Sequence, residues 1–569
     1  MRSNFNYLGV AVGLLISTAV AAQPKEKVGS VEINVFESYK ANIKEAKKVT
    51  GQPNYSDSTT QKIALKYEVR PRGMQFPYSP KPIPAARIAK ARVEKFPSNG
   101  VTLGVGNYIT SFAEIQTGSN RTRDFVWNAR FHHFRTQTGV SDIVFDKNTL
   151  YENRLEAQFK KLYRSSQWTS EVYGDNTLYS LYGIPKVSGI TDTALPQTPE
   201  LIQNMYNRVG VSSRYRYTGK SSKEFFRGIG GKYEYYFNDF STNGHRAYID
   251  TDWQVKAGDQ DIDILFGLDY NNTNQNSAVT QQFIPRLQPT IQTSLNNVAF
   301  TLGFNAVMPY TTNNTGVTSS ETRFGFFPII KLQMPLAKDV LSFYAGVEGD
   351  ATINDVWSLS RVNPYLASYV DVKPSSYVNV YGGLRGKLTK TLSYNLGVTQ
   401  QWNTEKAFFY RDPRGVLNGS DQGTFLVFYD KLNDLALRAE LGWESKGWEA
   451  GVWGTYHYYG GLEQLAQPFY LPELEGGLAL SYLWKNKIKL NTDWLFVGER
   501  YAFDPAINYP FLSPTLDSYI DARLGAEYFY NANLSAGINV TNLLSSSYEQ
   551  WLGYNAQEIR FLITLSYKF

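Results

Sequence analysis

Ile559-Arg-Phe-Leu-Ile-Thr-Leu-Ser-Tyr-Lys-Phe569 ends the chain, and its alternation decides the fold. Every second residue from Ile559 to Phe569 is apolar, and the residues between them are mostly polar. Successive side chains of an extended strand point to opposite faces, so one face of this strand suits lipid and the other water. The same period of two recurs in 247–256, 488–496 and 519–529. A chain that repeats this pattern is typical of an all-β, transmembrane antiparallel β-barrel.

The composition supports a membrane barrel. Tyr counts 41 and aromatic residues make up 15% of the chain, and Tyr and Trp favour membrane–water interfaces. Beyond residues 1–22, no apolar run is long enough for a membrane-spanning helix. The absence of Cys excludes disulfides and thiolate metal sites. A soluble sandwich or propeller is the alternative, but neither a repeat of about 40–50 residues nor a Cys–Trp–Cys pattern is present.

The first residues predict export. Arg2, the apolar run from Leu8 to Ala19 and the small residues at 19–22 are typical of a signal peptide. We assign 1–22 to the signal peptide, 23–84 to a periplasmic or lumenal arm and 85–569 to the barrel. Lys25–Lys95 contains 15 Lys and Arg against 7 Asp and Glu, a net charge of +8. Because the whole chain carries +6 and Arg2 adds one charge, the part from Gly100 carries −3, and no attraction to nucleic acid is indicated.

Short and longer links alternate along the body of the chain. We expect short turns at ten positions, which are Ser119, Ser166, Ser221, Gly258, Asn297, Lys338, Thr389, Gly447, Asn486 and Ala532. Bacterial barrels place short turns in the periplasm and longer loops outside, with both chain ends in the periplasm. The segment from Gly100 to Ser119 is therefore expected to run inward, which requires an outward strand ahead of it, at Ala86–Phe96. The best estimate is about 22 strands.

Four stretches near the end of the chain form a closing pattern. They are Leu516–Arg523, Asn533–Leu544, Tyr548 with Gly553-Tyr554, and Arg560-Phe561 with Tyr567-Lys568-Phe569. This pattern resembles the end of the barrel domain of TonB-dependent outer-membrane receptors, in which an Asn-Leu pair, a Tyr and a Gly-Tyr precede a terminal Phe. The resemblance implies a barrel of about 22 strands, transport, and contact with TonB. Val31-Glu-Ile-Asn-Val is the stretch that is similar to a TonB box.

The chain departs from that family ahead of the barrel. Receptors of the family carry a large plug domain, whereas the arm here is short and rich in Lys and Pro. A barrel of about 22 strands has a wide lumen, so we hypothesise that the arm or a partner protein fills it. The candidate lumen-facing polar residues are Asp250, Asp252, Asp493, Asp521, Arg523, Glu527 and Arg560.

The ends of the strands indicate further partners. The last strand, which ends in Phe569, resembles the signal that the barrel-assembly machinery recognises, and outer-membrane lipid is expected around the barrel. Long loops carry recognition on rigid scaffolds. Near the link at 403–424, the candidate surface-loop aromatics are Trp402, Phe408, Phe409 and Tyr410.

No motif predicts catalysis, a cofactor or a metal. His132 and His133 are adjacent, so they point to opposite faces of a strand, and the acidic run Asp259–Asp263 lacks the Gly and Glu of a calcium loop. Two functions stay open for this outer-membrane chain. The first is a transport barrel or channel whose lumen is closed by the arm or a partner, and the second is a non-conducting structural or assembly subunit of a larger outer-membrane complex. No motif supports a third function, that of an outer-membrane enzyme.

Overall fold

A computed structural model describes residues 99–569, except 120–123, 142–147, 184–202, 220–224, 259, 316, 338–339, 414–422 and 506–513. The assigned signal peptide, the arm and the strand expected at Ala86–Phe96 lie outside the described residues. Over the part of the chain that is described, no helix is both long and apolar enough to cross a bilayer.

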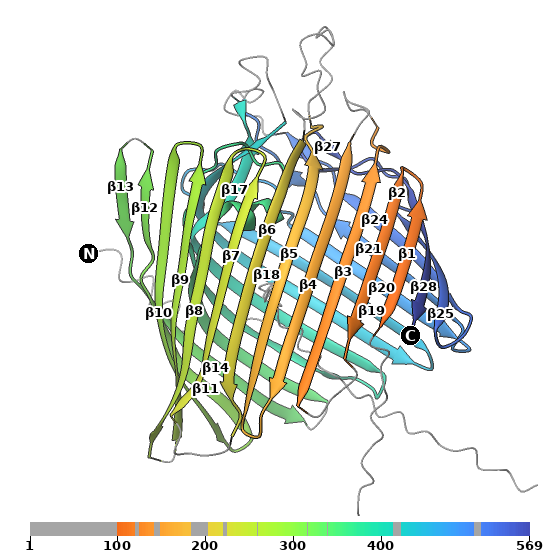
Figure 1. Cartoon of the computed structure of the whole chain (residues 1–569). Helices are drawn as coiled ribbons and strands as arrows, with labels where there is room; N and C mark the ends of the chain where they lie inside the picture. Colours follow the sequence, from red (N-terminus) through yellow and green to blue (C-terminus); the bar gives the residue numbers. More distant parts are fainter. Residues whose placement is uncertain are drawn as a thin grey trace, which may run out of the picture. The chain divides into compact units, whose positions relative to one another are not determined.

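Nearly all of the described chain is β-strand, and the strands run antiparallel around one continuous sheet (Figure 1). The strands of this sheet are β1 (Gly100–Gly106), β2 (Thr110–Gly118), β3 (Phe125–Gln137), β4 (Thr149–Leu162), β5 (Ser166–Ser180), β6 (Gln203–Tyr217), β7 (Phe226–Asn238), β8 (Thr242–Ala257), β9 (Gln260–Gln275), β10 (Ala278–Leu295), β11 (Val298–Val307), β12 (Tyr310–Asn314), β13 (Thr318–Thr322), β14 (Gly325–Ala337), β15 (Leu341–Thr352), β16 (Ser375–Lys387), β17 (Leu392–Arg411), β18 (Phe425–Ser445), β19 (Trp448–Gly460), β20 (Leu474–Trp484), β21 (Ile488–Val497), β24 (Tyr519–Phe529), β25 (Leu534–Thr541) and β28 (Arg560–Lys568).

The links between strands hold a few small elements. One helix, α2 (Val356–Val362), follows β15. Two hairpins form separate small sheets, the first from β22 (Arg500–Tyr501) and β23 (Thr515–Leu516), the second from β26 (Glu549–Trp551) and β27 (Tyr554–Asn555).

The large sheet closes on itself as a barrel of 22 strands. β11 and β12 both pair with β10, so together they are one interrupted strand. β13 and β14 pair with β12 and β11 in turn, so they are likewise one interrupted strand of the barrel. β1 pairs with β28 from Gly100↔Lys568 to Gly106↔Leu562. Closure leaves no sheet edge in the hydrocarbon, where each unpaired backbone group would cost several kcal/mol. The estimate of 22 strands is confirmed.

One prediction behind the estimate of 22 strands is wrong. The alternation predicts a single strand from Gly100 to Ser119, but the segment forms the hairpin β1–β2. The turn contains Tyr108 and Ile109 with φ of 53° and 51°, a left-handed conformation that favours Gly, Asn and Asp. Gly106 and Asn107, which precede these two residues, were the available sequence signal for the turn. This hairpin supplies the strand that was expected at Ala86–Phe96, and the sheet closes from Gly100 without it.

Every long link lies at one end of the barrel, which also holds the short turns at 107–109, 239–241 and 276–277 (Figure 1). Eight of the ten expected short turns fall in or next to a described link at the opposite end, while Ser221 and Lys338 lie outside the described residues. Lys446 and Gly447, which join β18 to β19, have φ of 42° and 90°, as a two-residue type I′ turn requires. Asn99 and Phe569 meet at this end, because the Phe569 N–H donates to the Asn99 carbonyl at 3.0 Å. Because the long links lie at the other end, this one is the periplasmic end.

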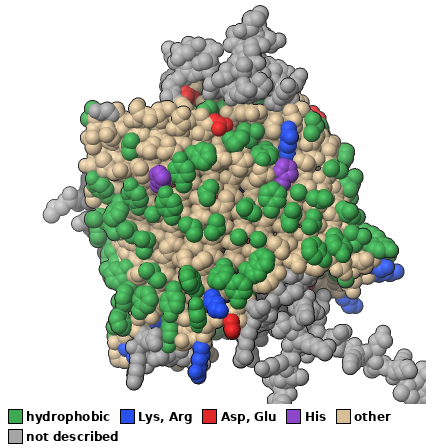
Figure 2. All heavy atoms as spheres, viewed as in Figure 1, with side chains coloured by type: hydrophobic (Ala, Val, Ile, Leu, Met, Phe, Trp, Pro, Cys, Tyr) green, Lys and Arg blue, Asp and Glu red, His purple; other side chains and the backbone are tan. Residues whose placement is uncertain are grey.

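The outward face of the barrel is apolar. On β28, Ile563 and Leu565 are 52% and 56% exposed, and the alternating residues Arg560 and Ser566 face the lumen. Figure 2 shows hydrophobic side chains spread over one side of the barrel wall, with few charged groups among them. An apolar surface around a closed barrel is the surface that contacts lipid.

A charged substitution on the outward face tests the assignment of that face to lipid. Replacing Ile563 with Arg near the middle of β28 should lower the free energy of unfolding by about 2–4 kcal/mol, because the charge enters the bilayer midplane. Urea unfolding in lipid vesicles measures it. The control is Thr564→Arg on the lumen face, for which we expect a smaller loss. Equal losses for the two variants would contradict the assignment of the faces.

Candidate functional site

Ion pairs cross the lumen wall over glycines. Arg214 in β6 donates to Asp250 in β8 at 2.5 Å and to Asp252 at 3.3 Å. Gly230, in the intervening strand β7, lies directly beneath, because a Cβ there would come within 2.5 Å of the Arg214 guanidinium and 2.8 Å of the Asp250 carboxylate. Gly230 therefore leaves room for a salt bridge that ties β6 to β8.

The same arrangement recurs one strand earlier. The Tyr173 hydroxyl in β5 donates to Glu234 in β7 at 2.8 Å, and its ring covers Gly210 in β6. Arg208 donates to the same Glu234 oxygen at 2.9 Å. Buried charges are tolerated only when they are paired and hydrogen-bonded, and here the pairing stiffens one wall of the lumen.

We call the link between β15 and β16 the 353–374 loop. This loop begins at that wall. Asp355 caps α2, since its Oδ1 accepts the Ser358 N–H at 2.6 Å while the Ser358 hydroxyl oxygen accepts the Asp355 N–H at 2.9 Å. The other carboxylate oxygen of Asp355 accepts from Arg246 in β8 at 3.2 Å. Asp355 is only 1% exposed, so one buried carboxylate both starts the helix and fixes it to the barrel.

Side-chain amides of the wall pair with the loop backbone. Gln275 in β9 donates to the Val370 carbonyl at 2.8 Å and accepts the Val370 N–H at 2.9 Å. Gln282 in β10 donates to the carbonyls of Asn354 and Val372, at 2.8 and 3.2 Å. These bonds satisfy loop backbone groups that would otherwise be buried without partners.

The middle of the loop contacts the opposite side of the barrel. Leu366 forms an isolated β-bridge with Phe425 at the start of β18, and the Phe425 N–H donates to the Tyr365 carbonyl at 2.8 Å. The Tyr365 ring stacks on Tyr554 of β27, with 3.4 Å between centroids and 17° between planes. The 353–374 loop therefore bridges the lumen from β6–β10 to β18 and the 542–559 link.

An apolar core holds the outer links together around this loop. Its buried members come from several links and strand ends, and they are Leu181, Tyr206, Tyr236, Val356, Leu359, Tyr365, Leu366, Ala367, Val370, Val372, Phe409, Phe425, Val427, Tyr429, Phe469, Tyr470, Ala502, Leu516 and Tyr554. Burial raises the pKa of Tyr365 well above its usual value, so its phenol stays neutral. A core of this extent marks the outer links as a packed unit rather than free loops.

The aromatics that were candidates for surface loops are placed differently. β17 continues to Arg411, so all four lie on a strand. Phe408 and Phe409 are 2% and 5% exposed, and the Phe409 ring packs edge-on against Trp551. Tyr410 lies 5.9 Å from the ring of Phe503. The expectation of exposed contacts is wrong for Phe408 and Phe409, because the strand extends beyond the alternating segment and the outer core covers its end.

The candidate polar residues divide into groups. Asp250 and Asp252 share Arg214, as described above. The Glu527 carboxylate accepts the Ser535 hydroxyl at 2.7 Å. Asp521 pairs with Arg523 at 2.9 Å, and both line one cavity with Arg560. Their role in binding stays a prediction.

That cavity, of about 480 Å³, lies between the 353–374 loop and the wall of β3–β5 and β24–β28. The wall contributes Asp521, Arg523 and Arg560, and the loop contributes Arg361 and Tyr365. Sequence reasoning missed Arg361. Its one signal is a basic residue in the last turn of a short helix, which is common wherever a helix ends.

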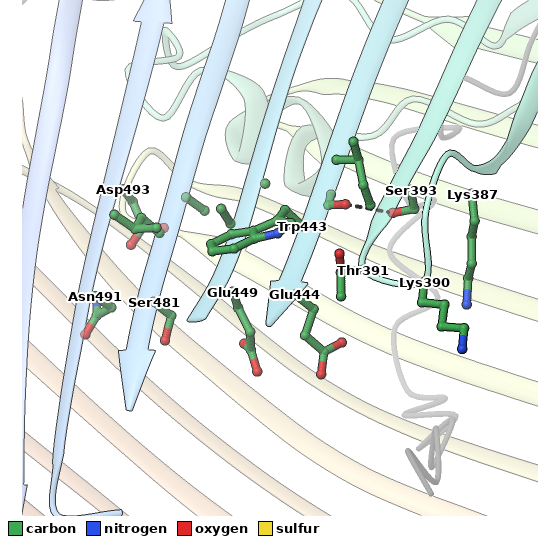
Figure 3. Close-up of a pocket in the computed structure, with 16 residues that line it drawn as sticks. Lys387, Lys390, Thr391, Ser393, Trp443, Glu444, Glu449, Ser481, Asn491 and Asp493 are labelled. Carbon is green, nitrogen blue, oxygen red and sulfur yellow. Dashed lines mark hydrogen bonds between the residues drawn. The ribbon is translucent and has the colours of Figure 1, made fainter. Parts of the chain in front are cut away.

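Asp493 lines a second hollow, of about 490 Å³, at the periplasmic end. Figure 3 shows Lys387 and Lys390 on one side of this hollow, Asp493 on the other, and Glu444 and Glu449 between them. All three carboxylates are exposed, and among the described residues none of them has an ion-pair partner. Likewise, within the described ranges no three His, Cys, Asp or Glu residues are grouped to hold a metal ion.

The anchoring of the loop can be tested at Asp355. Asp355→Ala removes a helix cap and a charged hydrogen bond, so we expect the opening free energy of α2 to fall by about 2–4 kcal/mol. Hydrogen–deuterium exchange at the Leu359 and Asn363 amides, which bond within the helix, reports it. Glu321→Ala removes the partner of an exposed ion pair and should leave α2 unchanged. Unaltered exchange in Asp355→Ala would show that the cap and Arg246 do not hold the loop.

Comparison with known proteins shows the fold. No family model matches the sequence, and no curated protein matches it either. Solved structures do match. The FrpB iron transporter from Neisseria meningitidis (F5-1 variant) shares 9% identity at a TM-score of 0.61, over 84% of this chain and 83% of that one. The siderophore receptor PirA from Acinetobacter baumannii shares 10% at 0.60, over 83% and 80%.

The ferric-catecholate import receptor Fiu from E. coli K12 shares 13% identity at a TM-score of 0.58, over 84% of this chain and 82% of that one. The proteins that this chain resembles in structure are thus transporters and receptors. The apolar outer belt and the 22-strand closure place the chain in the bacterial outer membrane. Its barrel has the fold of the barrel domain of TonB-dependent outer-membrane receptors.

Proposed function

We propose that the chain is an outer-membrane transport barrel that is closed toward the outside by its own 353–374 loop. The observation that carries the proposal is the contact of this loop with both sides of the lumen, through Arg246–Asp355 on one side and Leu366–Phe425 on the other. A barrel of 22 strands has a lumen too wide to be filled by wall side chains alone. Similarity to transporters and receptors favours a solute path through it.

The loop is held in a way that suits a gate. Its two ends are fixed to the wall by polar contacts at Asp355, Val370 and Val372, while its middle docks on an aromatic surface that includes Phe425 and Tyr554. Movement of the middle would break the backbone hydrogen bonds with Phe425, the ring stack on Tyr554 and the packing of Leu366 in the apolar core. Opening of the loop therefore requires a driving contact elsewhere in the protein.

We further propose that the basic arm, residues 23–84, closes the periplasmic half of the lumen. The described chain begins at Asn99, at the end where Phe569 also lies. The exposed carboxylates of Glu444, Glu449 and Asp493 line the hollow at that end, and residues 23–84, with 11 Lys and Arg against 6 Asp and Glu, carry a net charge of +5. Opposite charges that lack other partners attract across such a surface. Contact of the chain with TonB stays a proposal that rests on the resemblance alone.

The second function, a non-conducting subunit of a larger envelope complex, has one observation in its favour. The apolar core of the outer links is extensive, and a barrel whose mouth is permanently packed does not conduct. In that case the purified chain would show no solute flux and would be extracted in mild detergent together with a partner protein.

A disulfide between the loop and β18 tests whether the 353–374 loop is a gate that opens or a permanent closure. The chain has no Cys, and paired residues of a β-bridge lie close enough for a disulfide. We expect Leu366→Cys with Phe425→Cys to abolish solute flux into liposomes when oxidised and to regain it on reduction. The control pair is Thr102→Cys with Ser566→Cys, whose hydroxyls touch at 2.9 Å across the β1–β28 seam. Flux that is the same in both redox states would exclude the loop as the gate.

Deletion of residues 25–80 tests the arm. If the arm closes the periplasmic half, the single-channel conductance of events in which the loop is open should rise in planar bilayers, and a triple variant Glu444→Gln, Glu449→Gln, Asp493→Asn should show part of that rise because the arm loses its acidic partners. Lys331→Gln, which alters an ion pair outside the hollow, serves as the control. Unchanged conductance after the deletion would rule out closure by the arm and leave a partner protein.

A further inference from the structure

We propose that the cavity between the 353–374 loop and the wall binds a small solute with several carboxylate or phosphate groups. The inference rests on the proposed function, because one side of the cavity is the loop that we assign as the gate. It goes further by naming the chemical class of the solute and the residues that hold it. Three guanidinium groups, of Arg361, Arg523 and Arg560, face the cavity with one carboxylate, that of Asp521.

The charges of this cavity do not balance. Arg523 is paired with Asp521 at 2.9 Å, and its side chain is still 58% exposed. Arg560 lies on the neighbouring part of the wall, close enough to Arg523 for the two cations to repel each other. Among the described residues, no acid lies within ion-pair distance of Arg560. Its polar contact is the Gln557 side-chain oxygen at 3.2 Å, and its guanidinium lies over the Phe134 ring at 4.9 Å.

The loop adds a third cation from the opposite side. Arg361 is exposed and stands in the last turn of α2, and no ion pair involves it in the described part of the chain. With Arg523 neutralised by Asp521, the cavity holds two uncompensated positive charges that approach from loop and wall. Guanidinium groups bind carboxylate and phosphate in bidentate fashion, so an anion with two or more such groups satisfies both sides at once.

The rest of the lining sets the size and polarity of the solute. Tyr179, Tyr548 and Trp551 provide flat apolar surfaces, and the side chains of Asn542 and Gln557 provide amides. A cavity of about 480 Å³ is within the range that holds drug-sized ligands. The lining therefore fits a compact, hydrophilic anion that also presents a flat face or hydroxyl groups.

The position of the cavity decides between two sources of such anions. The wall residues Arg523 and Arg560 alternate with the lipid-exposed residues Leu524 and Phe561, so they are on the lumen face. Phosphate groups of membrane lipids approach the barrel from the other face. The ligand is consequently a dissolved solute rather than a lipid headgroup.

Isothermal titration calorimetry with the purified full chain in detergent tests the proposal. The probes are citrate and pyrophosphate at low salt, with glucose as a neutral control. We expect saturable binding of at least one anion and none of glucose. Arg361→Gln and Arg560→Gln should each weaken binding by about tenfold or more, since each removes a charged hydrogen bond, and Arg361→Lys should restore part of the loss.

The matched control is Arg385→Gln. Arg385 is a lumen-facing arginine of β16 that lies over the Tyr344 ring at 5.5 Å and does not line the cavity, so its loss should leave anion binding unchanged. Thermal unfolding shows that each variant is folded. The proposal is overturned if neither anion binds the wild-type chain, if Arg361→Gln and Arg560→Gln bind as tightly as the wild type, or if Arg385→Gln weakens binding equally.

The calorimetry tests the binding site, and flux into liposomes tests the transport function, so either proposal can be contradicted without the other. Anion binding without solute flux in liposomes supports the binding site and removes the transport function. Flux without anion binding keeps the transport function and overturns the site.

Discussion

The structure depends on one constraint, which is that backbone amides and carbonyls in hydrocarbon must pair within the protein. A sheet meets it only by closing, and here closure falls on the short seam between β1 and β28. The seam is tight at Gly106, where an added Cβ would come within 2.1 Å of the Phe561 carbonyl oxygen. A side chain there would push β1 away from β28 and expose two rows of unpaired groups. Glycine at this position is therefore a condition of the fold.

Closure with 22 strands creates the second problem, since the wall cannot fill its own lumen. The chain solves it with polar contacts at the wall and apolar contacts in the middle. Long side chains such as Tyr173 and Arg214 cross over glycines to reach the next strand but one, which keeps the wall rigid. The 353–374 loop hydrogen-bonds to that wall at its ends and packs through Leu366 and Tyr365 in its middle.

The repetitive part of this design could be predicted from sequence, because the period of two and the turn residues are local signals. The expected short turns that fall on described residues were found on that basis, and alternation put Asp521, Arg523 and Arg560 on the lumen face. The hairpin turn at Tyr108 and Ile109 was missed although Gly106 and Asn107 precede it, because the alternation of apolar and polar residues continues through it. Arg361 and the burial of Phe409 could not be predicted either. The position of Arg361 depends on a loop whose path is set by contacts with strands more than a hundred residues away in sequence, such as β8. The burial of Phe409 depends on Trp551, which is also more than a hundred residues away.

The position of the cavity constrains how a transport cycle must be driven. An anion that binds Arg361 on the loop together with Arg560 on the wall has its full affinity only while the loop is docked. Such a ligand shifts the equilibrium toward the docked state, because a ligand always favours the state that it binds better. Changing the ratio of docked to undocked loop from 99:1 to 1:99 takes about 5.5 kcal/mol of differential binding free energy. The bound anion favours the docked state, so its contribution opposes this change. The driving contact must therefore lie outside the cavity. The periplasmic end is where β1 begins and where the carboxylates of Glu444 and Glu449 have no partner among the described residues. A change in contacts at that end can release the solute without competing with it.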